Sequence, residues 1–185
     1  MPWIVAGAAL LAVVIMVANQ QSQPAPASPE AMAAPFAGGG AVRAPDISQM
    51  SPQERADRLY DRVMKLAAEG KGDSAAFFAS MAVGAYESLA PLTADQRYDM
   101  GRMAEMAGDF ATAKAQSDTI LREQPDHLLG IILEARTVMA RGDSTGGRQR
   151  LQRLAKVEAT ERAKSLEEYE RHRGDIDAAL ALLRR

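Results

Sequence analysis

The residue types that most often carry chemistry are few in this chain. It has no cysteine, which excludes thiol catalysis, disulfides and zinc–thiolate sites. Its two histidines, His127 and His172, lie much further apart than the ligands of a local metal-binding motif. We therefore interpret both as ordinary residues at helix ends. We expect no catalytic site, no metal and no cofactor.

Two glycine-containing segments do not fit a nucleotide-binding loop. The run Gly38-Gly39-Gly40 lacks the lysine and the flanking strand and helix of a phosphate-binding loop. The segment Ser144–Gly147 is better explained as a turn that enters a helix. An enzyme whose site the sequence does not reveal is an open alternative, but the prediction is a protein that is not an enzyme.

Charged side chains are segregated late in the chain, although the formal net charge is only −2. A basic patch is expected from Arg141, Arg148, Arg150, Arg153 and Lys156, and a run rich in glutamate follows it. We favour ion pairs between neighbouring helices over a surface for an acidic partner or lipid headgroups. The patch is small and has no interleaved aromatic residues, so nucleic acid is not an expected partner.

Candidate binding residues can be placed only after the chain is divided into repeats. Four Gly-Asp pairs recur at spacings of 36, 34 and 32 residues. They are Gly72-Asp73, Gly108-Asp109, Gly142-Asp143 and Gly174-Asp175. Such a period is typical of a helical solenoid. In each pair, we expect glycine to end one helix with φ > 0 and aspartate to cap the next.

Helix-start signals support an all-α fold. Ser51-Pro52-Gln53-Glu54 has a serine for the N-cap, proline at the first position and glutamate at the third, and Thr93–Gln96 has a similar form. Alanine, leucine, methionine, glutamate and arginine favour helix through the second half of the chain. The predicted helices span residues 52–69, 74–90, 94–107, 110–123, 126–141, 145–156, 159–172 and 176–184.

The clearest unit, residues 94–127, resembles the tetratricopeptide repeat family. Met100-Gly101 stands where that family has a Leu-Gly pair, Gly108-Asp109-Phe110 is similar to its turn, and Pro125 corresponds to its closing proline. Ala104 and Arg97 depart from the pattern, because the family has aromatic residues there. The resemblance extends over residues 51–185 and implies an α-solenoid of about four helix pairs that binds other proteins.

The resemblance also implies where a partner would bind. In this family, ligands lie in a concave groove lined by the first helix of each pair. The corresponding positions in the two clearest units are Tyr98, Arg102, Glu105, Met106, Leu129, Ile132, Arg136 and Met139. This mixture of apolar and charged side chains suits a peptide segment or a helix.

The N-terminal segment is expected to be a membrane anchor. Residues 3–18 are sixteen consecutive apolar residues, and residues 1–20 as a helix would be about 30 Å long, the thickness of a bilayer core. Trp3 suits the membrane interface, and Ala8 and Ala12 could pack against another helix. A cleaved signal peptide is the alternative, but this segment has no basic residue. We predict a single-pass bacterial inner-membrane protein with its repeats in the periplasm.

A linker separates the anchor from the repeats. Residues 21–50 are rich in proline, alanine and glycine, which opposes regular helix and favours an extended tether. The predicted organisation is therefore an anchor at residues 1–20, a linker at residues 21–50 and a repeat domain at residues 51–185.

These features together predict a non-enzymatic, membrane-anchored scaffold or accessory subunit. Its expected partners are the lipid bilayer, through residues 1–20, and other protein subunits of a membrane complex, of which respiratory and photosynthetic complexes are examples. The alternative is a transient chaperone or assembly factor for envelope proteins or cytochromes. A subunit would stay in a stoichiometric complex, whereas an assembly factor would exchange.

Overall fold

The computed structural model describes residues 50–184, and these residues are almost entirely helical, with no strand among them. The predicted all-α class is therefore confirmed for this part of the chain. The α-helices are α2 (Pro52–Ala68), α3 (Gly72–Glu87), α4 (Ala94–Met106), α5 (Phe110–Glu123), α6 (Leu128–Ala140), α7 (Ser144–Arg162), α8 (Glu167–Arg171) and α9 (Arg173–Ala181), followed by the 3₁₀ helix η2 (Leu182–Arg184).

The predicted anchor at residues 1–20, with Trp3, Ala8 and Ala12, lies outside the described residues, and so does the linker except for Met50. Within residues 50–184, none of the helices has the length and apolar character needed to cross a membrane.

The predicted helix starts are confirmed at α2 and α4. The Ser51 hydroxyl accepts a hydrogen bond from the Glu54 backbone N–H at 3.2 Å, and the Glu54 carboxylate accepts one from the Ser51 N–H at 2.7 Å. Thr93 and Gln96 make the same reciprocal pair, at 3.2 and 3.0 Å. Each of these reciprocal pairs is a capping box, and it provides hydrogen-bond acceptors for two backbone N–H groups that the first turn of a helix would otherwise leave free.

Two of the four Gly-Asp pairs form the predicted turn. Gly108 and Gly142 have φ of 79° and 94°, a backbone region that favours glycine. Asp109 and Asp143 then cap α5 and α7 by accepting a hydrogen bond from the backbone N–H three residues later, at 3.0 and 2.7 Å. The turns between α4 and α5 and between α6 and α7 are therefore nearly identical in design.

The first and last pairs differ from the prediction. Gly70, with φ of 73°, makes the first turn, while Gly72 is already the first residue of α3. Gly174 lies inside α9 rather than between two helices. A Gly-Asp dipeptide forms a turn only where the preceding helix ends directly before the glycine, so that the glycine can adopt positive φ.

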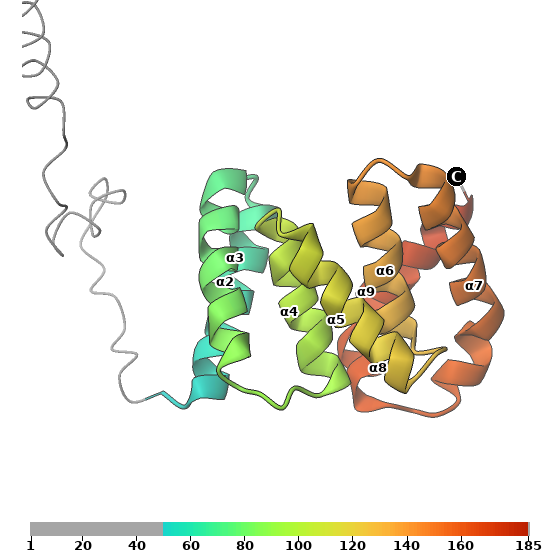
Figure 1. The fold of residues 1–185 in the computed structure, drawn as a ribbon, viewed down its shortest axis with the longest axis horizontal. Helices are drawn as coiled ribbons and strands as arrows, with labels where there is room; N and C mark the ends of the chain where they lie inside the picture. The colour runs from blue at the N-terminus through green and yellow to red at the C-terminus, as the bar shows by residue number, and fades with distance from the viewer. Residues whose placement is uncertain (1–49, 185) are drawn as a thin grey trace, which may run out of the picture. The chain divides into compact units, whose positions relative to one another are not determined.

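The helices from α2 to α7 form three pairs that pack in chain order (Figure 1). Helices α2 and α3, α4 and α5, and α6 and α7 are the pairs, and α3 packs on α4 as α5 packs on α6. Their buried side chains make two apolar clusters, one centred on α2 and α3 and the other on α4 to α7. Neighbouring pairs therefore share a core that no single pair could bury alone.

The end of the chain departs most from the predicted helix bounds. α7 continues to Arg162, beyond the break predicted near residue 157. It continues because no proline or glycine interrupts the helix at that point. The predicted helices 159–172 and 176–184 are replaced by the short α8 and by α9, which packs on α6 and α7. We refer to residues 167–184 as the C-terminal segment. Its apolar side is buried through the side chains of Tyr169, Ile176 and Ala179.

Candidate functional site

One face of α4 carries charged side chains at helical spacing. Asp95, Asp99 and Arg102 follow one another at four and three residues, which places them on one side of a helix. Asp99 and Arg102 are buried, and Asp95 is half-buried. A buried charge is costly unless it is paired. The partners come from the other end of the repeat domain.

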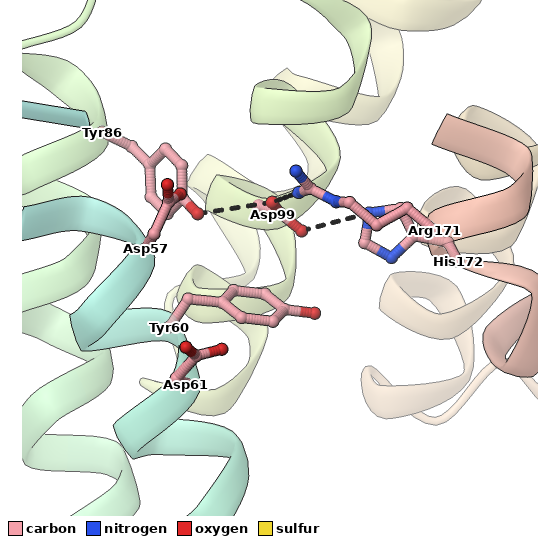
Figure 2. A pocket seen from close by; sticks show the side chains of 7 residues that line it. All are labelled: Asp57, Tyr60, Asp61, Tyr86, Asp99, Arg171 and His172. Atoms are coloured by element: carbon pink, nitrogen blue, oxygen red, sulfur yellow. Dashed lines mark hydrogen bonds and ion pairs between the residues drawn. The ribbon is translucent and has the colours of Figure 1, made fainter. Parts of the chain in front are cut away.

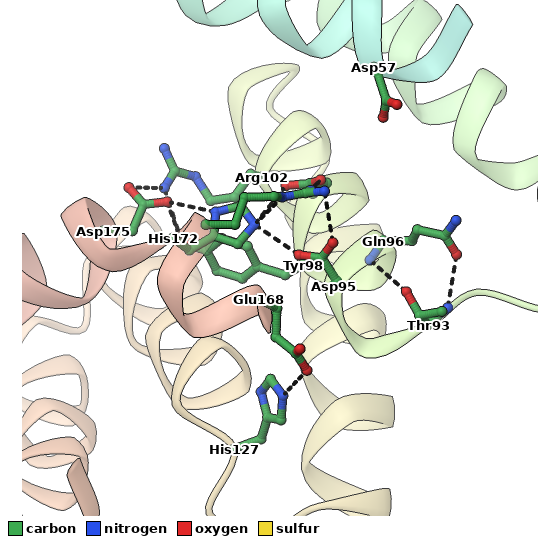
Figure 3. Close-up of polar contacts among 12 residues, drawn as sticks. Asp57, Thr93, Asp95, Gln96, Tyr98, Arg102, His127, Glu168, His172 and Asp175 are labelled. Carbon is green, nitrogen blue, oxygen red and sulfur yellow. Dashed lines mark hydrogen bonds and ion pairs between the residues drawn. The ribbon is translucent and has the colours of Figure 1, made fainter. Parts of the chain in front are cut away.

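Arg171 and His172, at the junction of α8 and α9, pair with both aspartates (Figures 2 and 3). Arg171 Nη1 lies 2.9 Å from Asp95 Oδ2, and its Nη2 binds Asp99 Oδ2. His172 Nε2 lies 3.0 Å from Asp95 Oδ1 and 3.4 Å from Asp99 Oδ1. Two carboxylates of α4 are thus neutralised by two adjacent cations of the C-terminal segment.

Asp175 of α9 extends this network. Its Oδ1 lies 3.2 Å from Arg102 Nη1, and its Oδ2 accepts a hydrogen bond from the Tyr98 hydroxyl at 2.9 Å. The Tyr98 ring packs edge-on against His172, with centroids 4.8 Å apart. We define the charged cluster as Asp95, Tyr98, Asp99, Arg102, Arg171, His172 and Asp175.

The cluster shifts the protonation of its members. Burial alone would lower the pKa of His172, but hydrogen bonds to Asp175 and Asp95 and the charge of Asp99 raise it to about 9. Burial would raise the pKa of Asp175, yet His172, Arg102 and Tyr98 hold it well below its ordinary value. Burial raises the pKa of Asp99 to about 6, against the charges of His172 and Arg171. At neutral pH the cluster therefore holds an imidazolium at His172 beside an ionised Asp175.

Asp95, Asp99 and His172 also place one potential metal ligand each within 4.8 Å of one another. A metal ligand must have a free lone pair, however, and because the pKa of His172 is raised, a metal ion would have to displace a proton from its ring at neutral pH. The Arg171 guanidinium lies on the same two carboxylates. The donor set fits an ion-pair cluster better than a metal site.

The other histidine, His127, helps to fix α8. Its Nε2 lies 3.3 Å from Glu168 Oε1, and burial lowers the pKa of its ring, although Glu168 opposes this shift. The neighbouring Tyr169 hydroxyl accepts a hydrogen bond from the Leu128 N–H at 3.2 Å and donates one to Glu161 Oε2 at 3.0 Å. His127 and His172 do lie at helix ends, as predicted, but both are buried and paired.

A cavity of about 260 Å³ opens beside the charged cluster (Figure 2). It is lined by Asp57, Tyr60 and Asp61 of α2, Tyr86 of α3, Asp99 of α4, and Arg171 and His172. The Tyr86 hydroxyl donates a hydrogen bond to Asp99 Oδ2 at 3.3 Å. Burial raises the pKa of Tyr60 and of Tyr86 well above the ordinary value, so both keep their proton at neutral pH.

The predicted groove residues are only partly accessible. Tyr98 and Arg102 are buried in the charged cluster, and Leu129 and Ile132 are buried in the core of α4 to α7. The other four predicted groove residues are half-buried, namely Glu105, Met106, Arg136 and Met139. Arg136 Nε lies 2.8 Å from Glu105 Oε2, so these two are already paired. Whether this surface binds a partner stays a prediction.

The predicted basic patch on and before α7 divides into two groups. Arg150 Nε lies 2.8 Å from Glu134, and Arg153 Nη2 lies 3.2 Å from Asp126, so these two bridge to α6 and the turn before it. Arg141, Arg148 and Lys156 are exposed and form no ion pair with any described residue. The favoured interpretation, ion pairs between helices, therefore applies to only part of the patch.

The sequence analysis missed the residues that the structure brings together at the cavity. The spacing of Asp95, Asp99 and Arg102 on one predicted helix was a usable signal for a charged face. Nothing in the sequence indicated that Arg171 and His172, 72 to 77 residues beyond their partners, would complete it.

Comparisons of this chain with protein families, with curated proteins and with solved structures found no match. The interpretation of the site therefore depends on its own geometry.

Proposed function

We propose that this chain is a non-enzymatic scaffold whose tetratricopeptide-like helical repeats bind other proteins. The observation that carries this proposal is the packing of α2 to α7 as three helix pairs in chain order. Such stacks provide extended surfaces that suit peptide segments and helices.

The proposal includes a membrane location. Residues 1–20 would form a single transmembrane helix, and residues 21–50 an extended linker to repeats on the periplasmic side of a bacterial inner membrane. The support is the apolar run of residues 3–18 and the composition of the linker. A tether of this kind raises the local concentration of the repeats near a membrane complex, such as a respiratory or photosynthetic one.

A second candidate is a transient chaperone or assembly factor for envelope proteins or cytochromes. The observation that favours it is that Tyr98 and Arg102, two predicted groove residues, are held by Asp175 of the chain's own C-terminal segment. A partner that needs these two residues would have to displace that segment, which suits exchangeable binding better than a permanent complex.

Site-specific photo-crosslinking in intact membranes tests the proposal. A photoreactive amino acid would replace Arg136 or Met106, which are half-buried predicted groove residues, and Ala115 on the exposed side of α5 would be the control position. We expect one dominant protein adduct from positions 136 and 106 and none from position 115. Adducts from all three positions alike, or from none, would contradict a partner-binding groove.

Native mass measurement after detergent extraction separates the two candidates. A stable subunit is expected to remain in a complex of fixed stoichiometry. A transient factor is expected to emerge as a free chain, with crosslinks that disappear when membranes are washed before irradiation.

A further inference from the structure

Two acidic residues of α2 differ from the other acids around the cavity. Asp95, Asp99 and Asp175 all pair with Arg171, His172 or Arg102. Asp57 accepts a hydrogen bond from the Gln53 side chain at 2.8 Å, and Asp61 is exposed. Within residues 50–184, neither Asp57 nor Asp61 forms an ion pair. Their charge is therefore available to a cation from outside.

The residues that line the cavity carry a formal net charge of −1, from three aspartates, one arginine and a protonated His172. Arg171 and His172 face Asp57 and Asp61 across it, but the carboxylates of α4 and α9 already neutralise these two cations. A second hollow, of about 200 Å³, is lined by the same two aspartates together with Met50, Glu54 and Arg58. Asp57 and Asp61 are thus accessible from both hollows.

The walls and size of the cavity suit one long side chain. Tyr60, which is half-buried, gives it an aromatic surface that can contact an aliphatic stem and attract a cation to its face. Its volume of about 260 Å³ is below the roughly 300–1,000 Å³ of pockets that enclose drug-sized molecules. A lysine or arginine side chain reaching in from a neighbouring protein fits this space.

The chain itself provides an example of such an interaction. The Arg171 side chain is 48% exposed, yet its guanidinium binds Asp95 and Asp99 at the edge of the cavity. Asp99 is almost fully buried, and its Oδ1 accepts no hydrogen bond, although His172 Nε2 approaches it to 3.4 Å. The carboxylates beside the cavity thus already hold one basic side chain that reaches them from the surface.

We propose that this cavity is the docking site for a lysine or arginine side chain of a partner protein segment. Asp57 and Asp61 bind the cation, while Tyr60 contacts its aliphatic stem; Figure 2 shows these three side chains of α2 around the cavity. The proposal rests on the proposed scaffold function and specifies the chemistry of its partner: a basic segment that lies along α2 beside the C-terminal segment.

Titration of the isotopically labelled full-length chain with two small probes tests this site by NMR. N-acetylarginine methylamide carries the charged group, and N-acetylcitrulline methylamide has the same length without the charge. We expect saturable shifts of the amides of Asp57, Tyr60, Asp61 and Tyr86 with the arginine probe. The citrulline probe should bind about fivefold more weakly or worse, the loss expected for one partly screened ion pair.

Substitutions identify which carboxylates bind the probe. The double variant Asp57→Asn and Asp61→Asn should weaken the arginine probe by about fivefold or more, while Glu87→Gln, which changes an exposed carboxylate on α3, should leave its affinity unchanged. Unchanged amide positions away from α2 would show that the double variant is folded. Equal binding of both probes, no saturable shift with either, or full affinity in the double variant would overturn the proposal.

The same variants distinguish a failure of this site from a failure of the proposed function. If the arginine probe binds through Asp57 and Asp61 but no crosslinked partner is found, the scaffold function is wrong and the basic-side-chain site remains. If a partner crosslinks at positions 106 and 136 equally in the wild type and the double variant, the scaffold function remains and the docking site is wrong.

Discussion

Single residues in this protein differ sharply in how much space surrounds them. Gly101 and Gly84 both lie inside helices, α4 and α3. A Cβ added at Gly101 would lie 2.3 Å from Cδ2 of Leu133, which is fully buried, whereas one added at Gly84 would meet nothing within 4 Å. Glycine at position 101 therefore lets α4 approach α6 closely, and glycine at position 84 has no such role.

Alanine substitutions at these two positions should consequently have opposite effects. We expect Gly101→Ala to lower the free energy of unfolding by about 1–3 kcal/mol, because Leu133 is forced out of its position. Gly84→Ala should raise it by about 0.5–1 kcal/mol, since alanine restricts the unfolded chain and favours helix. Urea denaturation of both variants measures the difference. Equal effects would show that the close contact of α4 with α6 is wrong.

His172 should make stability depend on pH in the alkaline range. Its pKa is about 9 in the folded chain and 6.5 ordinarily, so the folded state holds the proton more tightly. This contribution is complete below pH 6.5 and is lost as the pH rises through 9, with a full size of about 3 kcal/mol. We expect the thermal midpoint of the wild type to fall over this range.

The variant His172→Gln tests the origin of that pH dependence. Glutamine retains a hydrogen-bond donor but cannot titrate, so the midpoint of this variant should be lower at pH 7 and much flatter between pH 6.5 and 9. His127→Gln is the control, because burial lowers the pKa of His127 and its removal should leave the alkaline fall in place. A steep fall that persists in His172→Gln would assign it to another group.

At the scale of elements, the repeat depends on local capping. Asp109 and Asp143 are the N-caps of α5 and α7, and each side chain accepts a hydrogen bond from the backbone N–H three residues later. We expect Asp109→Ala to lower the free energy of unfolding by about 1 kcal/mol, the usual effect of losing an N-cap. Asp109→Asn should change it by no more than a few tenths, because asparagine caps about as well. Chemical denaturation would reject the capping role if the two variants lost the same amount.

At the scale of the whole molecule, the C-terminal segment is attached to the helix pairs by buried apolar side chains such as Tyr169 and Ile176 and, at one end, by the charges of Arg171 and His172. Arg171 reaches Asp99, whose side chain is only 2% exposed, and its removal leaves that carboxylate with less compensation. In contrast, Arg173, two residues later, pairs with no residue in the range 50–184 other than the exposed Glu170 of the same segment. These two arginines therefore form a matched pair for testing how the segment is held.

We expect Arg171→Gln to accelerate amide hydrogen exchange in residues 167–184, with little change in α2, α3 and α5. Arg173→Gln should leave exchange in that segment close to the wild type. Added salt should accelerate exchange in the wild type, because the half-exposed Arg171 pair is open to screening. Identical exchange in both variants would mean that apolar contacts of Ile176 and Tyr169 alone hold the segment.

Much of the helical framework could be predicted because its signals are local. Each of these signals depends on residues within a few positions of one another. They are the capping boxes at Ser51 and Thr93 and the turns at Gly108 and Gly142, where one helix ends before the next begins. Less of the candidate site was predictable. The family resemblance identified Tyr98 and Arg102 as groove residues. It did not indicate that Asp57, Asp99 and His172 belong to the same site.

The sequence by itself determined that residues after 50 form paired helices, because helix periodicity, caps and turns act over a few residues. Only the tertiary structure decided where the last helices lie and that Arg171 and His172 meet Asp95 and Asp99. The physical reason is distance along the chain. An ion pair across 72 to 77 residues depends on how several helix pairs stack and on which face the final segment covers, and no local pattern encodes either.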